Sequence, residues 1–136
     1  MTIDKSQIRH AATVIVLRDR HDDPKILMGQ RGAKAAFMPN KFVFPGGAVD
    51  AEDAQIPLAA PLPDTCAARL REDADPALAH AVAVAAVREL WEETGLILGR
   101  PGTWDIEPPA DWASFAATGH LPHAAPLQFV FRALTP

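Results

Sequence analysis

Short apolar runs separated by polar or proline-containing stretches characterise the N-terminal part of the chain. The runs at residues 12–17 and 25–31 have strand length, and the polar stretch 18–24 lies between them. This spacing predicts two strands joined as a hairpin with a loose turn. A third run at residues 42–44 predicts another strand, which should stop at the Pro-Gly-Gly sequence of residues 45–47. Two adjacent glycines permit close backbone approaches that a Cβ would resist.

The longest predicted element is a helix over residues 77–94, which contain neither proline nor glycine. Asp75 can cap its N-terminus, Pro76 suits the first helical position, and Gly95 ends it. Apolar residues recur on one face of this helix, and we expect that face to pack against the core. These residues are Ala83, Val84, Val87, Leu90 and Trp91.

The other predicted elements are shorter. The stretch at residues 48–75 is rich in proline and alanine and has room for one short helix, at residues 64–71. After the long helix, the pattern predicts a strand at 96–98, a short helix at 111–118 that Gly119 ends, and a last strand at 127–134. The pattern as a whole favours a loop-rich α/β fold over a plain helical bundle.

Composition narrows the class of protein. The chain has 136 residues, 49% of them hydrophobic, which suffices for a buried core and excludes a disordered chain. No repeat or linker divides it, so residues 1–136 are predicted to form a single domain. No apolar run approaches the ~20 residues of a membrane span, and we expect no membrane partner. The net charge of −4 speaks against a nucleic-acid partner.

Two observations bear on the cellular compartment. Cys66 is the single cysteine, so it has no partner for an internal disulfide and is expected to be a small, buried side chain. The N-terminal residues lack the apolar core of a secretion signal. Both favour a cytoplasmic protein.

Three carboxylates gather near the end of the long helix. At about 100° per residue, Glu89, Glu92 and Glu93 fall within an arc of about 100° on its surface. They repel one another, the helix dipole disfavours them, and Arg88 offsets only part of this cost. Taken alone, such a face is most often plain solvent-exposed surface. A divalent cation, Mg²⁺ or Mn²⁺, bound among the carboxylates would relieve the repulsion.

The order of these parts along the chain resembles the box of the Nudix hydrolases. Residues 88–96 read Arg-Glu-Leu-Trp-Glu-Glu-Thr-Gly-Leu and match the second half of that box throughout. Gly47 and Asp53, with five residues between them, match the spacing of the first half of the box. At the position of Asp53 the family has glutamate. A long insertion then separates Asp53 from Arg88, where the family has seven residues. At uninterrupted spacing the glutamate position would fall on His80, so we interpret the box as split by a loop.

The first-half acidic role therefore has three candidates, Asp50, Glu52 and Asp53, and the sequence does not choose among them. A split box is similar to the branch of the family that includes peroxisomal coenzyme A diphosphatases. Arg31 lies thirteen residues before Phe44, as a coenzyme A signature of the family requires. The signature's other side chains are replaced here by Gly32, Ala36 and Asn40. Coenzyme A is thus one candidate substrate beside ADP-ribose and NADH.

The resemblance implies an α+β fold in which a mixed sheet is sandwiched between helices, with an insertion at about residues 54–75. It implies metal-dependent hydrolysis of a diphosphate bond in a nucleoside diphosphate linked to another moiety, and hence a small nucleotide substrate. Glu89 would be the general base and Arg88 would orient it. The metal ligands would be Glu89, Glu92, Glu93 and the carbonyl of Gly46. The substrate would contact Arg31, Phe37, Gly47, Asp50 and Asp53.

Two alternatives remain open at this stage. One is a catalytically impaired Nudix-fold module that binds nucleotides or has a regulatory role. The other follows from the short stretch after Gly95, which the resemblance implies should hold more strands and a further helix. We expect a truncated family member or a chain completed by a partner subunit, with a homodimer among the options.

Overall fold

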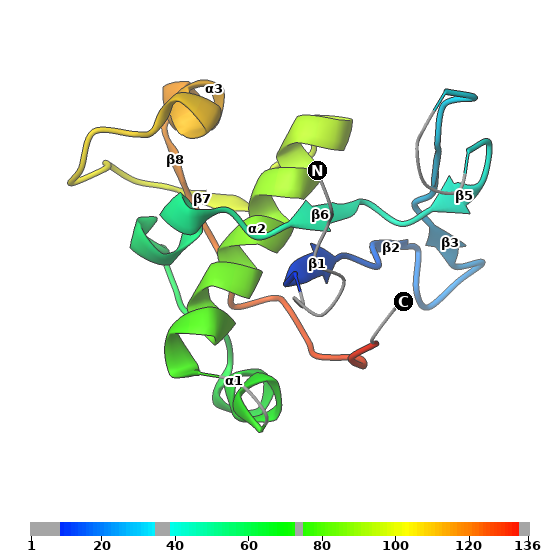
Figure 1. Cartoon of the computed structure of the whole chain (residues 1–136), viewed down its shortest axis with the longest axis horizontal. Coiled ribbons are helices and arrows are strands. Elements are labelled where there is room, and N and C mark those ends of the chain that lie inside the picture. The colour runs from blue at the N-terminus through cyan, green and yellow to red at the C-terminus, as the bar shows by residue number, and fades with distance from the viewer. Residues whose placement is uncertain (1–8, 35–38, 73–74, 134–136) are drawn as a thin grey trace, which may run out of the picture.

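A single long helix, α2 (Pro76–Thr94), runs through the middle of the molecule and organises the other elements around it (Figure 1). The computed structural model describes residues 9–34, 39–72 and 75–133. Within these ranges no helix is long and apolar enough to cross a membrane.

The ends of α2 are those that the sequence predicts. A side-chain oxygen of Asp75 accepts a hydrogen bond from the Ala77 amide at 2.8 Å, and Pro76 occupies the first turn. Gly95 follows the helix in the left-handed conformation, at a φ of 75°, and its amide donates to the Trp91 carbonyl. The predicted apolar face is also confirmed, because Ala83, Val84, Val87 and Leu90 are buried and Trp91 packs against the core.

The described strands form four two-stranded antiparallel pairs. The pairs are β1 (Ala11–Thr13) with β6 (Gly46–Ala48), β2 (Leu17–Arg18) with β3 (Lys25–Ile26), β4 (Gly29–Gln30) with β5 (Phe42–Val43), and β7 (Gly99–Pro101) with β8 (His120–Pro122). β1 and β6 pack against α2, whereas β2 to β5 extend away from the helix as an arm (Figure 1).

The predicted hairpin is confirmed in part: β2 and β3 pair across the turn, but each predicted strand is broken in two, and β1 and β4 pair with β6 and β5 instead. The predicted strand at residues 42–44 is confirmed by β5. The predicted end of this strand is confirmed, since β5 ends at Val43, but a further strand, β6, begins at Gly46 and was not predicted. β6 approaches β1 closely: a Cβ at Gly46 would clash with the carbonyl oxygen of Ala12 on β1. Glycine is therefore what permits this pairing.

Two strand predictions in the C-terminal half are wrong. Residues 96–98 are not a strand, and the strand begins at Gly99, where the backbone meets β8 closely enough that a Cβ would lie 3.0 Å from the Leu121 carbonyl oxygen. Residues 127–133 form no strand in the described part of the chain, and residue 134 lies outside it. Leu127 and Phe129 instead bury their side chains against a core cluster beside α1.

The two short helices are close to their predicted positions. α1 spans Asp64–Arg71, as predicted. The predicted helix at 111–118 is found as η2 (Ala110–Trp112) followed by α3 (Ala113–Ala117), and Gly119 ends it at a φ of 81°. A further 3-10 helix, η1 (Ala51–Gln55), was not predicted.

The core lies between α2, the insertion and the C-terminal segment. Ile56, from the insertion, is buried with Val84 and Val87 of α2 and with Trp112 and Phe115. The rings of Trp112 and Phe115 meet edge to face at 5.1 Å between centroids, a favoured aromatic geometry. The insertion is thus part of the fold and not a loop on its surface.

Cys66 on α1 is buried, as predicted, and burial raises the pKa of its thiol above the ordinary value. A raised pKa keeps the thiol protonated and unreactive at neutral pH. This fits a packing role for Cys66.

Candidate active site

Arg88, in the second-last turn of α2, is the centre of the candidate site. Its side chain is 4% exposed, and it faces the 1% exposed carboxylate of Asp53 in η1. The guanidinium donates from Nε to Asp53 Oδ1 at 3.2 Å and from Nη2 to Oδ2 at 3.0 Å. Two parallel bonds of this kind fix both the distance and the orientation of the pair.

The remaining donors of Arg88 connect it to β6 and to the glutamates. Nη2 donates to the Ala48 carbonyl at 2.9 Å, and Nη1 donates to Glu89 Oε1 at 2.9 Å and to Glu92 Oε2 at 3.5 Å. Burial disfavours the charged guanidinium, but the hydrogen bonds and charges of the surrounding carboxylates outweigh this and raise the pKa of Arg88. Arg88 therefore stays charged and holds three elements in one arrangement.

The structure separates the three candidates for the first-half acid. Asp53 forms the buried bidentate pair with Arg88 and also accepts the Asp50 amide at 2.7 Å, which ties down the start of η1. Asp50 is 46% exposed and lies 3.4 Å from Arg88 Nη2. Glu52 is exposed. Asp53 thus occupies the position that contacts Arg88 most closely.

The two glycines of β6 lie directly against the glutamates. A Cβ at Gly47 would clash with the carboxylate of Glu89, so this close packing requires glycine. The Gly46 amide donates to Glu93 Oε2 at 3.2 Å. In this structure, it is the amide of Gly46 that contacts an acidic side chain, and the prediction that its carbonyl binds a metal remains a prediction.

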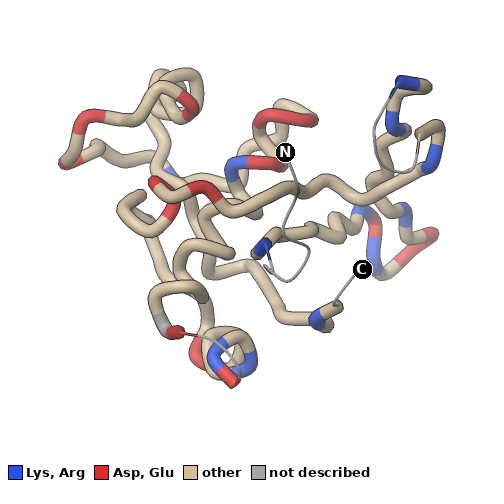
Figure 2. Tube along the Cα trace, in the orientation of Figure 1, with Lys and Arg blue, Asp and Glu red and all other residues tan. Residues whose placement is uncertain are grey.

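Two of the glutamates have perturbed acidities. Partial burial raises the pKa of Glu92; Arg88 lowers it, while the negative charges of Glu89, Asp111 and Asp50 raise it further. Partial burial also raises the pKa of Glu93, against the hydrogen bond from Gly46. Figure 2 shows the acidic segments concerned, in the last turns of α2 and after β6. In both cases burial is the largest cause, and the charges of neighbouring carboxylates add to it.

Comparisons with known proteins bear on the fold and on the family resemblance. No protein-family model matches the chain. A curated relative from Caenorhabditis elegans, named "Putative nudix hydrolase 7", is 37% identical over 78 residues, which cover 57% of this chain and 19% of the relative. The crystal structure of a NUDIX hydrolase from Alicyclobacillus acidocaldarius superposes with a TM-score of 0.65 at 29% identity, over 96% of this chain and 63% of that one. The chain has the Nudix hydrolase fold.

The similarity confirms the α+β class and the predicted resemblance to Nudix hydrolases. The chain spans about a fifth of the length of the curated relative and less than two thirds of the solved chain. The closer likeness to coenzyme A diphosphatases stays a prediction, as do the boundaries of the domain and of its insertion.

The glutamates of the Nudix box fit a divalent cation in some respects. Their oxygen donors suit Mg²⁺ or Mn²⁺. Burial is the largest cause of the raised pKa values of Glu92 and Glu93, and the neighbouring negative charges, which a cation would offset, raise them further. Within the described ranges, however, no three acidic, histidine or cysteine side chains are arranged so as to enclose an ion. The donors therefore fit by chemical type and charge, while Arg88 occupies the space between Glu89 and Glu92.

Two predicted substrate contacts lie before the Nudix box. The positive charge of Arg31 lowers the pKa of Glu93, so Arg31 lies close enough to act on the acidic cluster. Its backbone is held by hydrogen bonds with Lys41 and Asn40 at the end of the β4–β5 pair. Phe37 lies outside the described residues.

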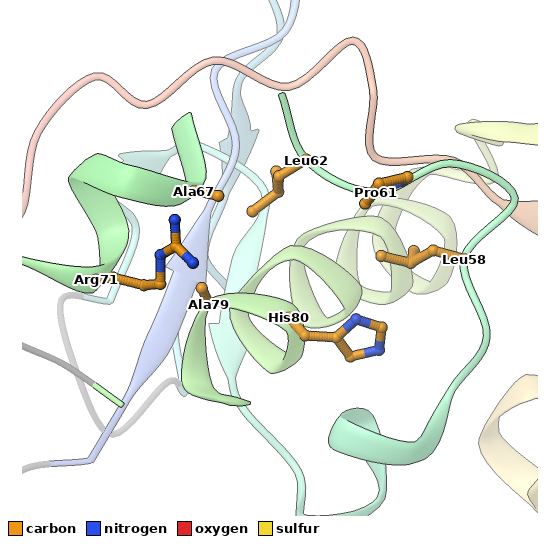
Figure 3. A pocket seen from close by; sticks show the side chains of 7 residues that line it. All are labelled: Leu58, Pro61, Leu62, Ala67, Arg71, Ala79 and His80. Carbon is orange, nitrogen blue, oxygen red and sulfur yellow. The ribbon is translucent and has the colours of Figure 1, made fainter. Parts of the chain in front are cut away.

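His80, which uninterrupted spacing would place in the box, lies elsewhere. It lines a small hollow of about 160 Å³ between α1, the N-terminal half of α2 and residues 58–62 (Figure 3). Its Nε2 lies 2.8 Å from the Ile56 carbonyl oxygen. This agrees with the interpretation that the box is split, since Asp53 and not His80 reaches Arg88.

Sequence reasoning missed two contributors to the site. The Ala48 carbonyl binds Arg88, and the negative charge of Asp111 in η2 acts on Glu92. Trp91 Nε1 donates to Ser114 Oγ at 2.9 Å, which brings the α3 region against the end of α2. No signal in the sequence identifies these contacts, because a backbone carbonyl has no side-chain signature and Asp111 lies far along the chain from the box.

Proposed function

We propose that this chain hydrolyses the diphosphate bond of a nucleoside diphosphate linked to another moiety, as in ADP-ribose, NADH or coenzyme A. The observation that carries the proposal is the buried Arg88, which binds Asp53, Glu89 and Glu92 at once beneath the glycines of β6. Charged side chains that served only to keep the protein soluble would lie on its surface. They would not be buried in a network of this kind. The sequence and fold similarity to Nudix hydrolases supports the same reaction class.

Glu89 is the proposed general base. Its carboxylate lies against Gly47 and is oriented by Arg88 Nη1, so one oxygen is fixed while the side chain stays partly accessible. It would take a proton from the attacking water. The water oxygen then bonds to one phosphorus, the bridging P–O bond breaks, and the two products each carry a phosphate group.

Glu89, Glu92 and Glu93, with the Gly46 carbonyl, are the proposed ligands of Mg²⁺ or Mn²⁺. When bound, the cation supplies neutralisation of phosphate charge and a lower pKa for the attacking water. Arg88 positions Glu89 and Glu92 relative to each other. Asp53 is buried and would act on the substrate through Arg88, not by direct contact.

The remaining proposed substrate contacts are Arg31, Phe37, Gly47 and Asp50. Arg31 would bind phosphate, since its charge already reaches Glu93. The absence of a Cβ at Gly47 lets the Glu89 carboxylate pack against it, which places Gly47 at the proposed catalytic group. The proposed substrate is a small phosphorylated molecule, and the cytoplasmic location stays a prediction.

One observation favours a second candidate function, a Nudix-fold module that binds nucleotide without turnover. In the described part of the chain no three acidic side chains are arranged so that they could enclose an ion. Calorimetric titration with nucleotide and with Mg²⁺ or Mn²⁺, read beside a turnover assay, separates the two. Nucleotide binding with neither metal binding nor turnover supports the binding module, whereas metal binding with turnover supports the hydrolase.

A substrate panel tests the proposal directly. Coenzyme A, ADP-ribose, NADH and nucleoside triphosphates are incubated with the protein and Mg²⁺ or Mn²⁺. We expect at least one of the diphosphate-linked compounds to be cleaved and Glu92→Gln to lower kcat by ~100-fold or more. Glu107→Gln, an exposed carboxylate in the loop after β7, is the matched control and should leave kcat unchanged. Equal turnover by wild type and Glu92→Gln would place the site elsewhere.

A further inference from the structure

A hollow of about 370 Å³ lies beside the acidic cluster. It is lined by Arg9, His10, Ala48, Val49, Asp50 and Ala51. Two of these residues also touch the candidate active site: the Ala48 carbonyl accepts from Arg88, and Asp50 lies 3.4 Å from Arg88 Nη2. A molecule held at the site can therefore extend into the hollow.

The pairing of β1 with β6 places Arg9 and His10 there. Ala11 lies opposite Ala48 in the antiparallel register, and the hydrogen bond from the Val49 amide to the His10 carbonyl, at 2.9 Å, extends the pairing by one position. Arg9 then falls opposite Asp50. Two residues from before β1 and two from after β6 thus meet at one edge of the pair.

The charged side chains at this edge do not form ion pairs with one another. Asp50 pairs with Arg88 on the side of the active site, and within the described ranges Arg9 takes part in no ion pair or hydrogen bond. Arg9 lines the hollow, and no described residue uses the donors of its guanidinium. His10 is exposed beside it and has a ring N–H donor in either neutral tautomer.

We propose that this hollow binds a phosphate monoester on the nucleoside side of the substrate, in addition to the diphosphate that is cleaved. The inference rests on the proposed function. A planar guanidinium with free donors matches a phosphate group in geometry and charge, and a neighbouring imidazole adds a further donor. The preferred substrates are then nucleoside diphosphate derivatives whose ribose carries an extra phosphate.

Matched substrate pairs test this preference. Coenzyme A is compared with 3′-dephospho-coenzyme A, and NADPH with NADH, under the same metal conditions. We expect kcat/KM to be about tenfold higher for the member of at least one pair that carries the extra phosphate. A difference of about tenfold is what one charge-assisted hydrogen bond contributes. Arg9→Gln should abolish most of this preference and leave turnover of the unphosphorylated member unchanged. Arg100→Gln, on the exposed part of β7, is the control and should keep the preference.

A binding measurement separates this inference from the proposed function. Adenosine 3′,5′-bisphosphate and AMP are titrated into the protein by calorimetry in the presence of EDTA. We expect the bisphosphate to bind about tenfold more tightly, and Arg9→Gln to remove the difference. Equal affinities, or a preference that survives in Arg9→Gln, would overturn the inference. Absence of any hydrolysis by wild type would overturn the proposed function, and the binding result would then decide the inference alone.

Discussion

Arg88 and Asp53 form the most buried of the ion pairs among the described residues. Removing two charges from water is costly, and the cost is offset here by two hydrogen bonds from the guanidinium to one carboxylate and by two further contacts to Ala48 and Glu89. The stability of the fold is therefore sensitive to the loss of one member of this network, because the partner left behind remains buried without its counter-charge.

Asp53→Asn is therefore expected to destabilise the protein by about 3 kcal/mol, since it leaves the buried Arg88 short of its main counter-charge. Asp50→Asn is the matched control. Asp50 also faces Arg88 but is 46% exposed, so its loss should cost less than about 1 kcal/mol. Urea unfolding of the three proteins measures both values. Equal costs for the two variants would show that Asp53 does not dominate the pairing.

The raised pKa of Glu92 makes a prediction about pH. A carboxyl whose pKa is higher in the folded chain than in the unfolded chain loses stability as the pH rises through that folded pKa. Glu92→Gln removes this penalty, so at neutral pH the variant should melt at the same temperature as wild type or higher. Below about pH 4 the carboxyl is protonated in both states and the difference should vanish. Thermal melts across this range test it, and a variant that is less stable at neutral pH would contradict it.

At the same scale, the residues of the site divide into those that sequence could predict and those it could not. Glu89, Glu92 and Glu93 lie at three- and four-residue spacing on one helix, so their proximity follows from helix geometry alone. Asp53 could not be chosen over Asp50 and Glu52, because all three are acidic and the choice depends on which of them is buried against Arg88. That contact joins distant parts of the chain.

At the scale of elements, β6 connects the strand layer to the site through two glycines with different neighbours. Gly46 lies against the backbone of β1, whereas Gly47 lies against the flexible side chain of Glu89. A backbone cannot move aside without breaking the strand pair, but a side chain can change its rotamer. The two positions therefore respond differently to an added methyl group.

Gly46→Ala is expected to lower the free energy of unfolding by about 1–3 kcal/mol, because it forces β1 and β6 apart. Gly47→Ala should cost less stability but reduce kcat, because it displaces the Glu89 carboxylate. Gly32→Ala, where a Cβ would meet nothing within 4 Å, serves as the control. Melting temperatures and turnover measured together test this. The reverse pattern, with Gly47→Ala the less stable of the two, would count against the assigned contacts.

The elements that the sequence mispredicts share one property. The strands β6, β7 and β8 are each three residues long and exist only because a partner strand lies opposite them. Residues 96–98 and 127–133 have strand-like composition but no such partner. The α2 helix, in contrast, satisfies its hydrogen bonds internally and carries its own caps, which is why its bounds could be predicted closely.

At the scale of the whole molecule, the insertion joins α2 to the C-terminal segment. The Ala59 amide donates to the Pro122 carbonyl at 2.8 Å, and the Ala124 amide to the Ala60 carbonyl at 3.1 Å. With Ile56 buried beneath it, the insertion allows the two halves of the Nudix box to lie side by side although they are far apart in sequence. Asp53 and Arg88 therefore lie together although they are 35 positions apart in sequence, as the proposed split box requires.

Assembly beyond one chain stays a prediction. A homodimer would show a mass in solution of twice 14.6 kDa, measured by light scattering after size exclusion at several concentrations. A mass that stays at the monomer value throughout would contradict it.

Hydrolysis in ¹⁸O-labelled water tests the central claim most directly. Wild type is incubated with a diphosphate-linked nucleotide from the panel and with Mg²⁺ or Mn²⁺, and the masses of the products are measured by mass spectrometry. We predict two phosphorylated products, one of them carrying a single ¹⁸O, with formation lowered by ~100-fold or more in Glu92→Gln. Failure to cleave any compound of this class, or labelled products formed equally by Glu92→Gln, would contradict the account.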